Sequence, residues 1–247
     1  MGRSWSRYTL LPLSPASLSD SANMIQTIEA SPDEIYDIEL EHSLLEANAR
    51  LAKENRVLLD GHGITAIDVM GAIGSGKTTL IGLLVSKLKD RLGVAVFNGD
   101  ATTSSDTDLI AEQNVPVVQI ATVNGCHLDA NLVGKALRKV DLDGLRLIFI
   151  ENIGNLICPA EFPLGSKARV VVVSVTEGQH MVRKHPHMFF GAHLVVINKV
   201  DLAEAMNVSV SQLAHDVHML KPDIKVISAS CKDGTGLDEI ARELVAI

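Results

Sequence analysis

The sequence predicts a doubly wound, mostly parallel α/β fold. Short runs of four to six residues are apolar throughout and rich in β-branched side chains, which is typical of strands buried on both faces of a parallel sheet. Amphipathic stretches of helical length alternate with these runs, which favours βα units. Apolar residues make up 47% of the 247 residues and aromatic residues only 3%, so the core must be mainly Val, Ile, Leu and Ala. The predicted strands include Val94–Phe97, Val115–Ile120, Leu145–Ile150, Val170–Val175 and Leu194–Ile197.

The chain divides into three segments. Residues 1–30 are rich in Ser, Pro and Leu and lack the coherent apolar stretch of a signal peptide, so we expect a disordered N-terminal extension, with Met24 as a candidate natural start. Residues 36–60 carry leucines at helical spacing and predict an N-terminal helix, which Gly61 ends. Residues 61–247 are expected to form one nucleotide-binding domain.

Charge and hydropathy exclude several classes of partner. The formal net charge is −8 and the chain contains no basic block, which argues against nucleic acid. No apolar run approaches the roughly 20 residues that a membrane-spanning helix needs. The three cysteines are an odd number without a short secreted framework, which favours a reducing, cytoplasmic location.

A glycine-rich loop with the spacing G-x-x-x-x-G-K-T follows the apolar run Ile64–Met70 and precedes a helix with apolar periodicity. Its glycines let backbone N–H groups turn inward toward a phosphate chain. Lys77 adds a positive charge near the β- and γ-phosphates, and Thr78 supplies a hydroxyl ligand for Mg²⁺. The loop therefore predicts nucleotide binding. Its candidate contact residues are Gly71, Gly74, Ser75, Gly76, Lys77, Thr78 and Thr79.

Two later loops indicate that the base is guanine. The Asp201 carboxylate can accept hydrogen bonds from both N1–H and the N2 amino group of guanine, while Asn198 braces the site and Lys199 lies across the base. Ser228 and Ala229 follow a further predicted strand, where a backbone N–H can meet guanine O6. The alternative for the first loop is an ordinary polar connection. The order of the three signals along the chain favours GTP over ATP.

Two acidic residues are candidates for the magnesium and switch region. Glu151 and Gly154 follow a predicted strand, so Glu151 can reach Mg²⁺ through water and the Gly154 N–H can sense the γ-phosphate. Asp100 follows another strand end, with a helix cap or turn as the alternative role. We count Lys77, Asp100, Glu151 and Gly154 as the candidate catalytic residues. Neither a water-orienting glutamine nor an arginine finger is evident, so intrinsic turnover is expected to be slow.

Cys126, His127 and Cys158 are candidate ligands for a soft or borderline metal ion such as Zn²⁺ or Ni²⁺. By spacing alone, the alternative is that they are small buried residues. Both loops leave the carboxyl ends of predicted parallel strands, however, and therefore lie on the nucleotide side of the sheet. Cys231 is interpreted as a packing residue.

Together these residues resemble the hydrogenase nickel-incorporation GTPases of the HypB family, in particular the archaeal members, over about residues 36–247. The resemblance implies a P-loop GTPase fold of the dimerising metallochaperone type. It also implies that Cys126, His127 and Cys158 hold Ni²⁺ or Zn²⁺ between the subunits of a GTP-dependent homodimer. The most specific stretches are GAIGSGKTTL at 71–80, NGCHLDA at 124–130, FIENIGNLICPAEFPLG at 149–165, HPHMF at 185–189 and VVINKVDL at 195–202.

The resemblance implies nickel delivery during [NiFe]-hydrogenase maturation, with a HypA-type zinc metallochaperone and the hydrogenase large subunit as partners. It further suggests that Thr78, Asp100 and Glu151 surround Mg²⁺. No N-terminal Cys-x-x-Cys-Gly-Cys motif or His-rich tract precedes the GTPase domain in this sequence, so nickel storage there is not expected. The alternatives are a related GTPase serving urease or a cobalamin enzyme, a non-catalytic nickel or zinc store, and a small-molecule kinase. Ala160 stands after Cys158-Pro159 where a urease-type motif would have histidine.

Overall fold

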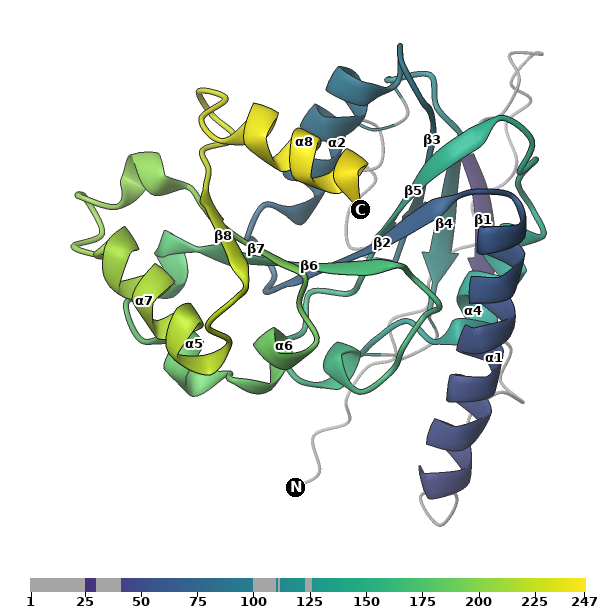
Figure 1. The fold of residues 1–247 in the computed structure, drawn as a ribbon, viewed down its shortest axis with the longest axis horizontal. Helices are drawn as coiled ribbons and strands as arrows, with labels where there is room; N and C mark the ends of the chain where they lie inside the picture. The colour runs from purple at the N-terminus through teal and green to yellow at the C-terminus, as the bar shows by residue number, and fades with distance from the viewer. Residues whose placement is uncertain (1–24, 30–40, 100–109, 111, 123–125) are drawn as a thin grey trace, which may run out of the picture.

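A parallel sheet organises the protein. The computed structural model describes residues 25–29, 41–99, 110, 112–122 and 126–247. Within these residues the sheet has eight strands in the order β1-β4-β3-β5-β2-β6-β7-β8, and each neighbouring pair is parallel (Figure 1). The strands are β1 (Ile25–Glu29), β2 (Thr65–Gly71), β3 (Gly93–Asn98), β4 (Val117–Ala121), β5 (Leu145–Glu151), β6 (Ala168–Ser174), β7 (Leu194–Asn198) and β8 (Lys225–Ser228).

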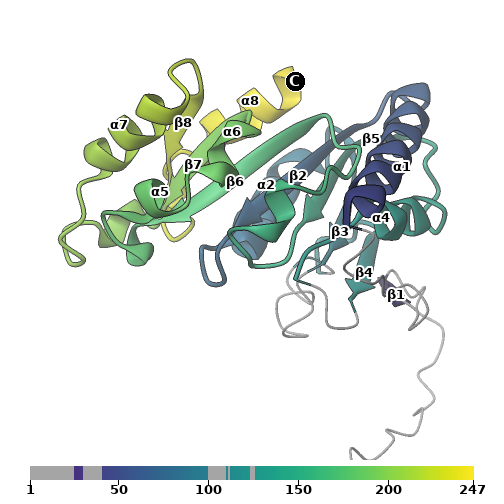
Figure 2. The same cartoon turned by 90° about the horizontal axis from the view of Figure 1, so that it is seen from below.

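Helices cover both faces of the sheet, as the doubly wound prediction requires. Helices α2 and α8 share one face, while α1 and α4 lie together on the opposite face beside the β3–β5 half, and α5, α6 and α7 cover its β6–β8 half (Figures 1 and 2). The helices are α1 (Glu41–Gly61), α2 (Lys77–Leu88), α4 (Ala130–Leu137), α5 (Met181–Lys184), α6 (His187–Phe190), α7 (Val210–Leu220) and α8 (Leu237–Ala246). Short 3-10 turns are η3 (Cys158–Ala160), η4 (Val175–Glu177) and η5 (Val200–Leu202).

The alternation of side chains along the strands produces these two layers. Val170 and Val172 of β6 belong to the core beneath α2 and α8, whereas Val171 and Val173 belong to the core beneath α5, α6 and α7. Successive side chains of a strand point to opposite faces, so a central strand buried on both faces must be apolar at nearly every position. This requirement explains why the strands could be predicted from runs of apolar residues in the sequence.

The structure differs from the expected element bounds in several places: most strand ends shift by one or two residues, and Val175, expected in a strand, begins η4. Residues 1–30 were expected to be a disordered extension, but residues 25–29 form β1, which pairs in parallel with β4. The rest of that extension lies outside the described residues. The strand expected at Val115–Ile120 begins instead at Val117, directly after Pro116. Proline has no backbone N–H to donate to a neighbouring strand, which accounts for the later start.

The strand β2 lies between β5 and β6, and its carboxyl end opens directly into the glycine-rich loop. The loops that follow β3, β5 and β7 leave the same edge of the sheet, because parallel strands present their carboxyl ends together. The topology therefore gathers the candidate residues at one edge. Among the helices in the described part of the chain, none is both long and apolar enough to cross a membrane.

An ion pair between two helices gives a test of how this fold is stabilised. The Arg183 guanidinium donates to both carboxylate oxygens of buried Asp216, at 2.7 and 2.8 Å, and Gln212 donates to the same carboxylate at 2.8 Å. These contacts join α5 to α7. The hydrogen bond from Arg183 holds the pKa of Asp216 below its usual value, against the opposing effect of burial.

We expect Arg183→Gln to lower the free energy of unfolding by about 1–3 kcal/mol at pH 7, because a buried carboxylate loses its charged donor while Gln212 still binds it. Since the folded-state pKa of Asp216 is depressed, the stabilisation is present above the unfolded-state pKa and is lost as pH falls through the folded-state value. Urea unfolding of both proteins, followed by circular dichroism from pH 7 down to about pH 2, measures this, because the loss falls below the unfolded-state pKa of about 3.9. A stability difference that grows on acidification would contradict the prediction.

Candidate nucleotide and metal site

The glycine-rich loop folds as a tight cradle between β2 and α2. Gly74 and Gly76 adopt positive φ angles of 77° and 94°, which favour glycine. A Cβ on Gly76 would lie 2.5 Å from the Asn198 side-chain nitrogen, so the loop also needs glycine there to approach β7. Lys77 begins α2 and is buried, with its ammonium group 3.2 Å from the Ala72 carbonyl oxygen. The N-terminus of α2 and this ammonium group therefore face the loop, an arrangement suited to anion binding.

Thr78 and Glu151 meet beside this loop. The Thr78 hydroxyl donates a hydrogen bond to Glu151 Oε1 at 2.6 Å, which joins the first turn of α2 to the end of β5. Glu151 is fully buried, and the Gly99 N–H donates to its carbonyl oxygen at 2.9 Å. A hydroxyl and a carboxylate in contact are oxygen ligands of the kind that Mg²⁺ takes. Asp100, the other acidic candidate, lies outside the described residues.

Gly154 packs directly on the phosphate loop. A Cβ on Gly154 would lie 2.5 Å from Ile73 Cγ1 and 3.0 Å from the Ile73 backbone nitrogen. The segment after β5 therefore touches the loop at a point where no larger residue fits without movement. A displacement of the phosphate loop must displace this segment as well.

Asn198 and Lys199, from the proposed guanine loop, both bind the phosphate loop. The Asn198 side-chain amide donates to the Ser75 carbonyl oxygen at 2.9 Å, and the Lys199 ammonium group donates to the Gly74 carbonyl oxygen at 2.6 Å. Asp201 follows in η5 with an exposed side chain. This carboxylate is therefore accessible to a ligand.

The neighbouring loop after β8 is hydrogen-bonded to the Asn198–Asp201 loop. Ser228 ends β8 with an exposed side chain, and the Ala229 carbonyl oxygen accepts a hydrogen bond from the Val200 N–H at 3.1 Å, which ties the two loops together. The Ala229 N–H, however, donates to the Ile197 carbonyl oxygen at 2.8 Å, and the Ser230 N–H donates to the Thr235 carbonyl oxygen at 3.1 Å. Both amides are thus hydrogen-bonded within the protein, and a backbone N–H of this loop that meets guanine O6 stays a prediction. Thr79, the last candidate of the phosphate loop, lies in the first turn of α2 with its side chain exposed.

Cys126, His127 and Cys158 converge although two loops supply them. One ligand atom from each residue lies within 4.8 Å of the others, and Cys126 Sγ lies 3.4 Å from His127 Nδ1. Among the described residues this is the one group of three or more His, Cys, Asp or Glu side chains with such spacing. Cys126 is exposed and the other two are half-buried, so an ion can reach them from solvent. Two thiolates and an imidazole suit Zn²⁺ or Ni²⁺.

The surroundings of Cys126 and His127 disfavour the charged forms of these two side chains. Burial and the adjacent Cys158 thiol raise the pKa of the Cys126 thiol. Burial lowers the pKa of His127, while the Asp129 and Glu161 carboxylates oppose that shift. The His127 ring also stacks on Phe162, with ring centroids 3.8 Å apart. Because a metal ion needs thiolate and neutral imidazole, its binding must release thiol protons.

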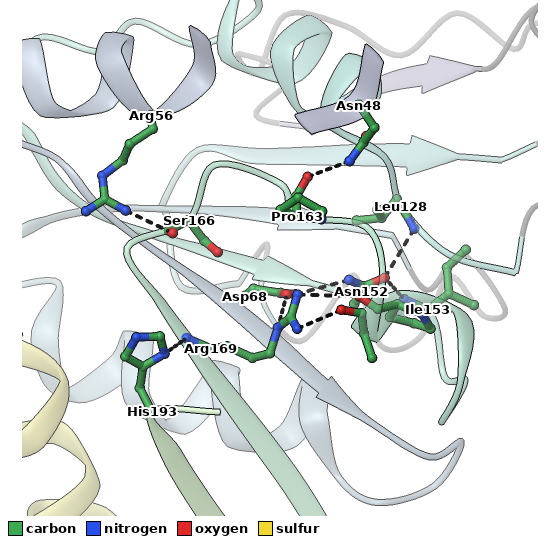
Figure 3. A network of polar contacts seen from close by, with 12 residues as sticks. Asn48, Arg56, Asp68, Leu128, Asn152, Ile153, Pro163, Ser166, Arg169 and His193 are labelled. Carbon is green, nitrogen blue, oxygen red and sulfur yellow. Dashed lines mark hydrogen bonds and ion pairs between the residues drawn. The ribbon is translucent and has the colours of Figure 1, made fainter. Parts of the chain in front are cut away.

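Three residues that sequence reasoning missed lie behind the metal-ligand candidates. Asp68, Asn152 and Arg169 form a buried polar group in which Asp68 accepts from both partners at 3.0 Å (Figure 3). Two signals were available in the sequence: a single aspartate inside the apolar strand 64–70, and Asn152 inside the stretch at 149–165. Neither signal identified which side chains they would contact.

Comparison with known proteins identifies a family for this chain. Residues 65–228 match the nucleotide-binding domain family CobW/HypB/UreG. The chain is 45% identical to the probable hydrogenase maturation factor HypB of Methanocaldococcus jannaschii over 203 residues, which are 82% of this chain and 92% of that protein.

Two solved structures are similar in fold and sequence. The hydrogenase maturation factor HypB of Archaeoglobus fulgidus has a TM-score of 0.78 at 40% identity, covering 81% of this chain and 98% of that one. HypB of Helicobacter pylori, solved in complex with nickel, has a TM-score of 0.76 at 33% identity, covering 81% of this chain and 94% of that one. Sequence identity at this level over most of both chains establishes kinship: the chain belongs to the HypB family of hydrogenase maturation factors.

Proposed function

We propose that this protein is a GTP-hydrolysing metallochaperone that delivers nickel during [NiFe]-hydrogenase maturation. The observation that carries the proposal is the continuity of the two sites. Cys158 begins η3 in the segment that packs on the phosphate loop through Gly154, and one ligand atom each from Cys126, His127 and Cys158 lies within a 4.8 Å group. The nickel complex of the Helicobacter pylori relative supports nickel as the cargo. Zn²⁺ is the alternative ion for the same donors.

The nucleotide contacts follow from the loop chemistry. Asp201 selects guanine by accepting from N1–H and the N2 amino group, and Lys199 packs its stem on the base. Lys77 and the first amides of α2 hold the phosphates. Thr78 and Glu151, with Asp100, hold Mg²⁺, and their contact at 2.6 Å fits oxygen ligation. When bound, Mg²⁺ neutralises charge on the phosphate oxygens.

Nucleotide state controls the cargo through the segment after β5. GTP binding repositions the segment around Gly154, two protomers associate, and the cysteines and histidine of each protomer meet at the dimer axis. Hydrolysis relaxes the segment that carries Cys158 and loosens the ion for transfer to the hydrogenase large subunit, with a HypA-type zinc protein as collaborator. A storage module would need neither the contacts of Asn198 and Lys199 with the phosphate loop nor a switch glycine packed on Ile73.

Lys77→Ala should abolish GTP hydrolysis, because it removes the positive charge next to the phosphates. The wild-type protein alone should hydrolyse GTP more slowly than about 1 s⁻¹, since an arginine finger is worth about 10³–10⁵ in rate and none is evident. Phosphate release in single-turnover and steady-state assays measures both, with melting temperature as the control for folding. Unchanged hydrolysis by Lys77→Ala would rule out this site as the GTPase centre.

Asp201→Asn should weaken GTP binding about 10- to 100-fold, because the amide cannot accept from both guanine donors and the loss of a charged hydrogen bond is worth about 1.5–3 kcal/mol. The same variant should bind xanthosine triphosphate better than the wild type does, since the new amide can donate to the carbonyl oxygen at C2 of xanthine. Titration with fluorescent analogues of both nucleotides gives the two affinities. The guanine assignment fails if the order of preference stays the same in the variant.

Nickel affinity should differ between the GDP-bound protein and the protein bound to a non-hydrolysable GTP analogue. Cys126→Ala and Cys158→Ala should each remove the difference and weaken binding at least tenfold, whereas Cys231→Ala is the matched control. Cys231 is half-buried and packs beside the core under α2 and α8. Binding should strengthen as pH rises, because burial raises the pKa of the Cys126 thiol and the thiols must lose protons.

Competition titrations of Ni²⁺ and Zn²⁺ against a chromophoric chelator at pH 6.5, 7.5 and 8.5 measure these affinities. Equal nickel affinity in the two nucleotide states would remove the coupling from the proposal. Loss of binding in Cys231→Ala alone would place the ion elsewhere.

A further inference from the structure

The strand that leads into the phosphate loop carries a buried carboxylate that the nucleotide chemistry does not use. Asp68 lies within β2, is fully buried, and pairs in register with Arg169 of β6. Its two carboxylate oxygens bind different partners: Oδ1 accepts from the Asn152 side-chain amide and Oδ2 from Arg169 Nε, each at 3.0 Å (Figure 3). Each partner leads to a different metal-ligand loop.

Asn152 connects Asp68 to the loop of Cys126 and His127. Its side-chain oxygen accepts the Leu128 N–H at 3.2 Å, and Leu128 is the residue directly after His127. Leu128 is itself buried and closely approaches Gly99, because a Cβ on Gly99 would lie 2.7 Å from its side-chain carbons. The position of Asn152 therefore fixes the position of the backbone directly after His127 in this ligand loop.

Arg169 connects Asp68 to the loop of Cys158. Its two terminal nitrogens donate to the carbonyl oxygens of Ala160 at 3.2 Å and Pro159 at 3.4 Å, the two residues after Cys158 in η3. The guanidinium group can do this because its planar fork presents several donors in fixed directions. Arg169 thus holds the turn that presents the second thiol.

The geometry points to Asp68, Asn152 and Arg169 as positioning residues that set the spacing of Cys126 and His127 relative to Cys158, and hence the affinity for the metal ion. This inference rests on the proposed function, in which those three side chains hold the cargo. The same group lies on the path from nucleotide to metal. Asn152 directly follows Glu151 and donates its backbone N–H to the Val69 carbonyl oxygen of β2 at 3.0 Å.

The burial of Asp68 agrees with such a role. Full burial raises the pKa of this carboxyl group, and the charge of Arg169 opposes the shift. A buried carboxylate with two donors tolerates little displacement, because moving either donor leaves a desolvated oxygen without compensation. The loop of Cys126 and His127 and the loop of Cys158 are therefore both held in place through the Asp68 carboxylate.

Arg169→Lys and Asn152→Ala test the inference, with Arg183→Lys as the matched control. Lysine keeps the charge beside Asp68 but has one compact head group, which cannot reproduce the directions of the guanidinium fork toward the Pro159 and Ala160 carbonyls. Asn152→Ala keeps the ion pair and removes the acceptor for the Leu128 N–H. Arg183→Lys makes the same exchange in another ion pair to a buried carboxylate, Asp216, which joins α5 to α7.

The measurement is titration of the full chain with Co²⁺ and Ni²⁺, read from the thiolate-to-metal charge-transfer absorption, with GDP affinity and melting temperature recorded for each variant. We expect Arg169→Lys and Asn152→Ala to weaken metal binding at least tenfold and to change the charge-transfer band, while GDP binding stays within about threefold of wild type. Arg183→Lys should lower the melting temperature without changing the band. If Arg169→Lys does not fold, the metal titration of Asn152→Ala tests the inference by itself.

Wild-type affinity and an unchanged band in Arg169→Lys and Asn152→Ala would overturn the positioning role while leaving the metal site intact. An equal change of the charge-transfer band in Arg183→Lys would also overturn the positioning role, because a general loss of stability would then explain the change in all three variants. If the wild-type protein itself binds neither ion, or if Cys126→Ala binds as the wild type does, the proposed function fails and the inference with it. The wild-type and Cys126→Ala titrations therefore separate the two failures.

Discussion

The close approach of neighbouring strand ends around the phosphate loop is the constraint on which the rest of the structure depends. A side chain at Gly76 would collide with Asn198, and one at Gly154 would collide with Ile73. Because these positions lack side chains, the loop after β2 can touch the loops after β5 and β7 at the same time. Contact at this distance lets a bound phosphate influence segments that do not touch it.

The polar contacts at this edge form a continuous set. Thr78 binds Glu151 on one side of the phosphate loop, and Asn152, the next residue, binds Asp68 and Leu128 on the other. Lys199 binds the Gly74 carbonyl oxygen, so the base-recognition loop is attached to the same cradle. Buried polar groups cost free energy unless they are paired, which restricts these side chains to few arrangements. Such a set can change between discrete states but deforms poorly by small steps.

Unlike these buried polar contacts, the metal-ligand group is open to solvent. Cys126 is exposed and the other two ligands are half-buried, so the group is accessible while its supporting residues are not. Stacking on Phe162 orients His127, and burial favours the neutral forms of both His127 and Cys126. Accessibility suits an ion that must enter and leave, and a rigid base behind the ligands keeps their spacing defined.

The sequence by itself determined the parallel sheet, the phosphate loop and the identity of the candidate ligands. Strands buried on both faces must be apolar at successive positions, and a phosphate loop needs glycines and a lysine at fixed spacing. Both features can therefore be predicted from short stretches of sequence. Even the grouping of Cys126 with Cys158 could be expected, because the loops after parallel strands share one edge.

Only the tertiary structure decided which buried side chains connect those motifs. Asp68 and Arg169 stand 101 positions apart, and nothing local distinguishes a buried aspartate that holds two loops from one that is merely tolerated in a strand. The Ala229 N–H donates to the Ile197 carbonyl oxygen, and β1 joins the edge of the sheet from a segment that was expected to be disordered. Such pairings depend on which partner each buried group meets once distant strands are aligned. That is a property of three-dimensional register, which local residue patterns do not encode.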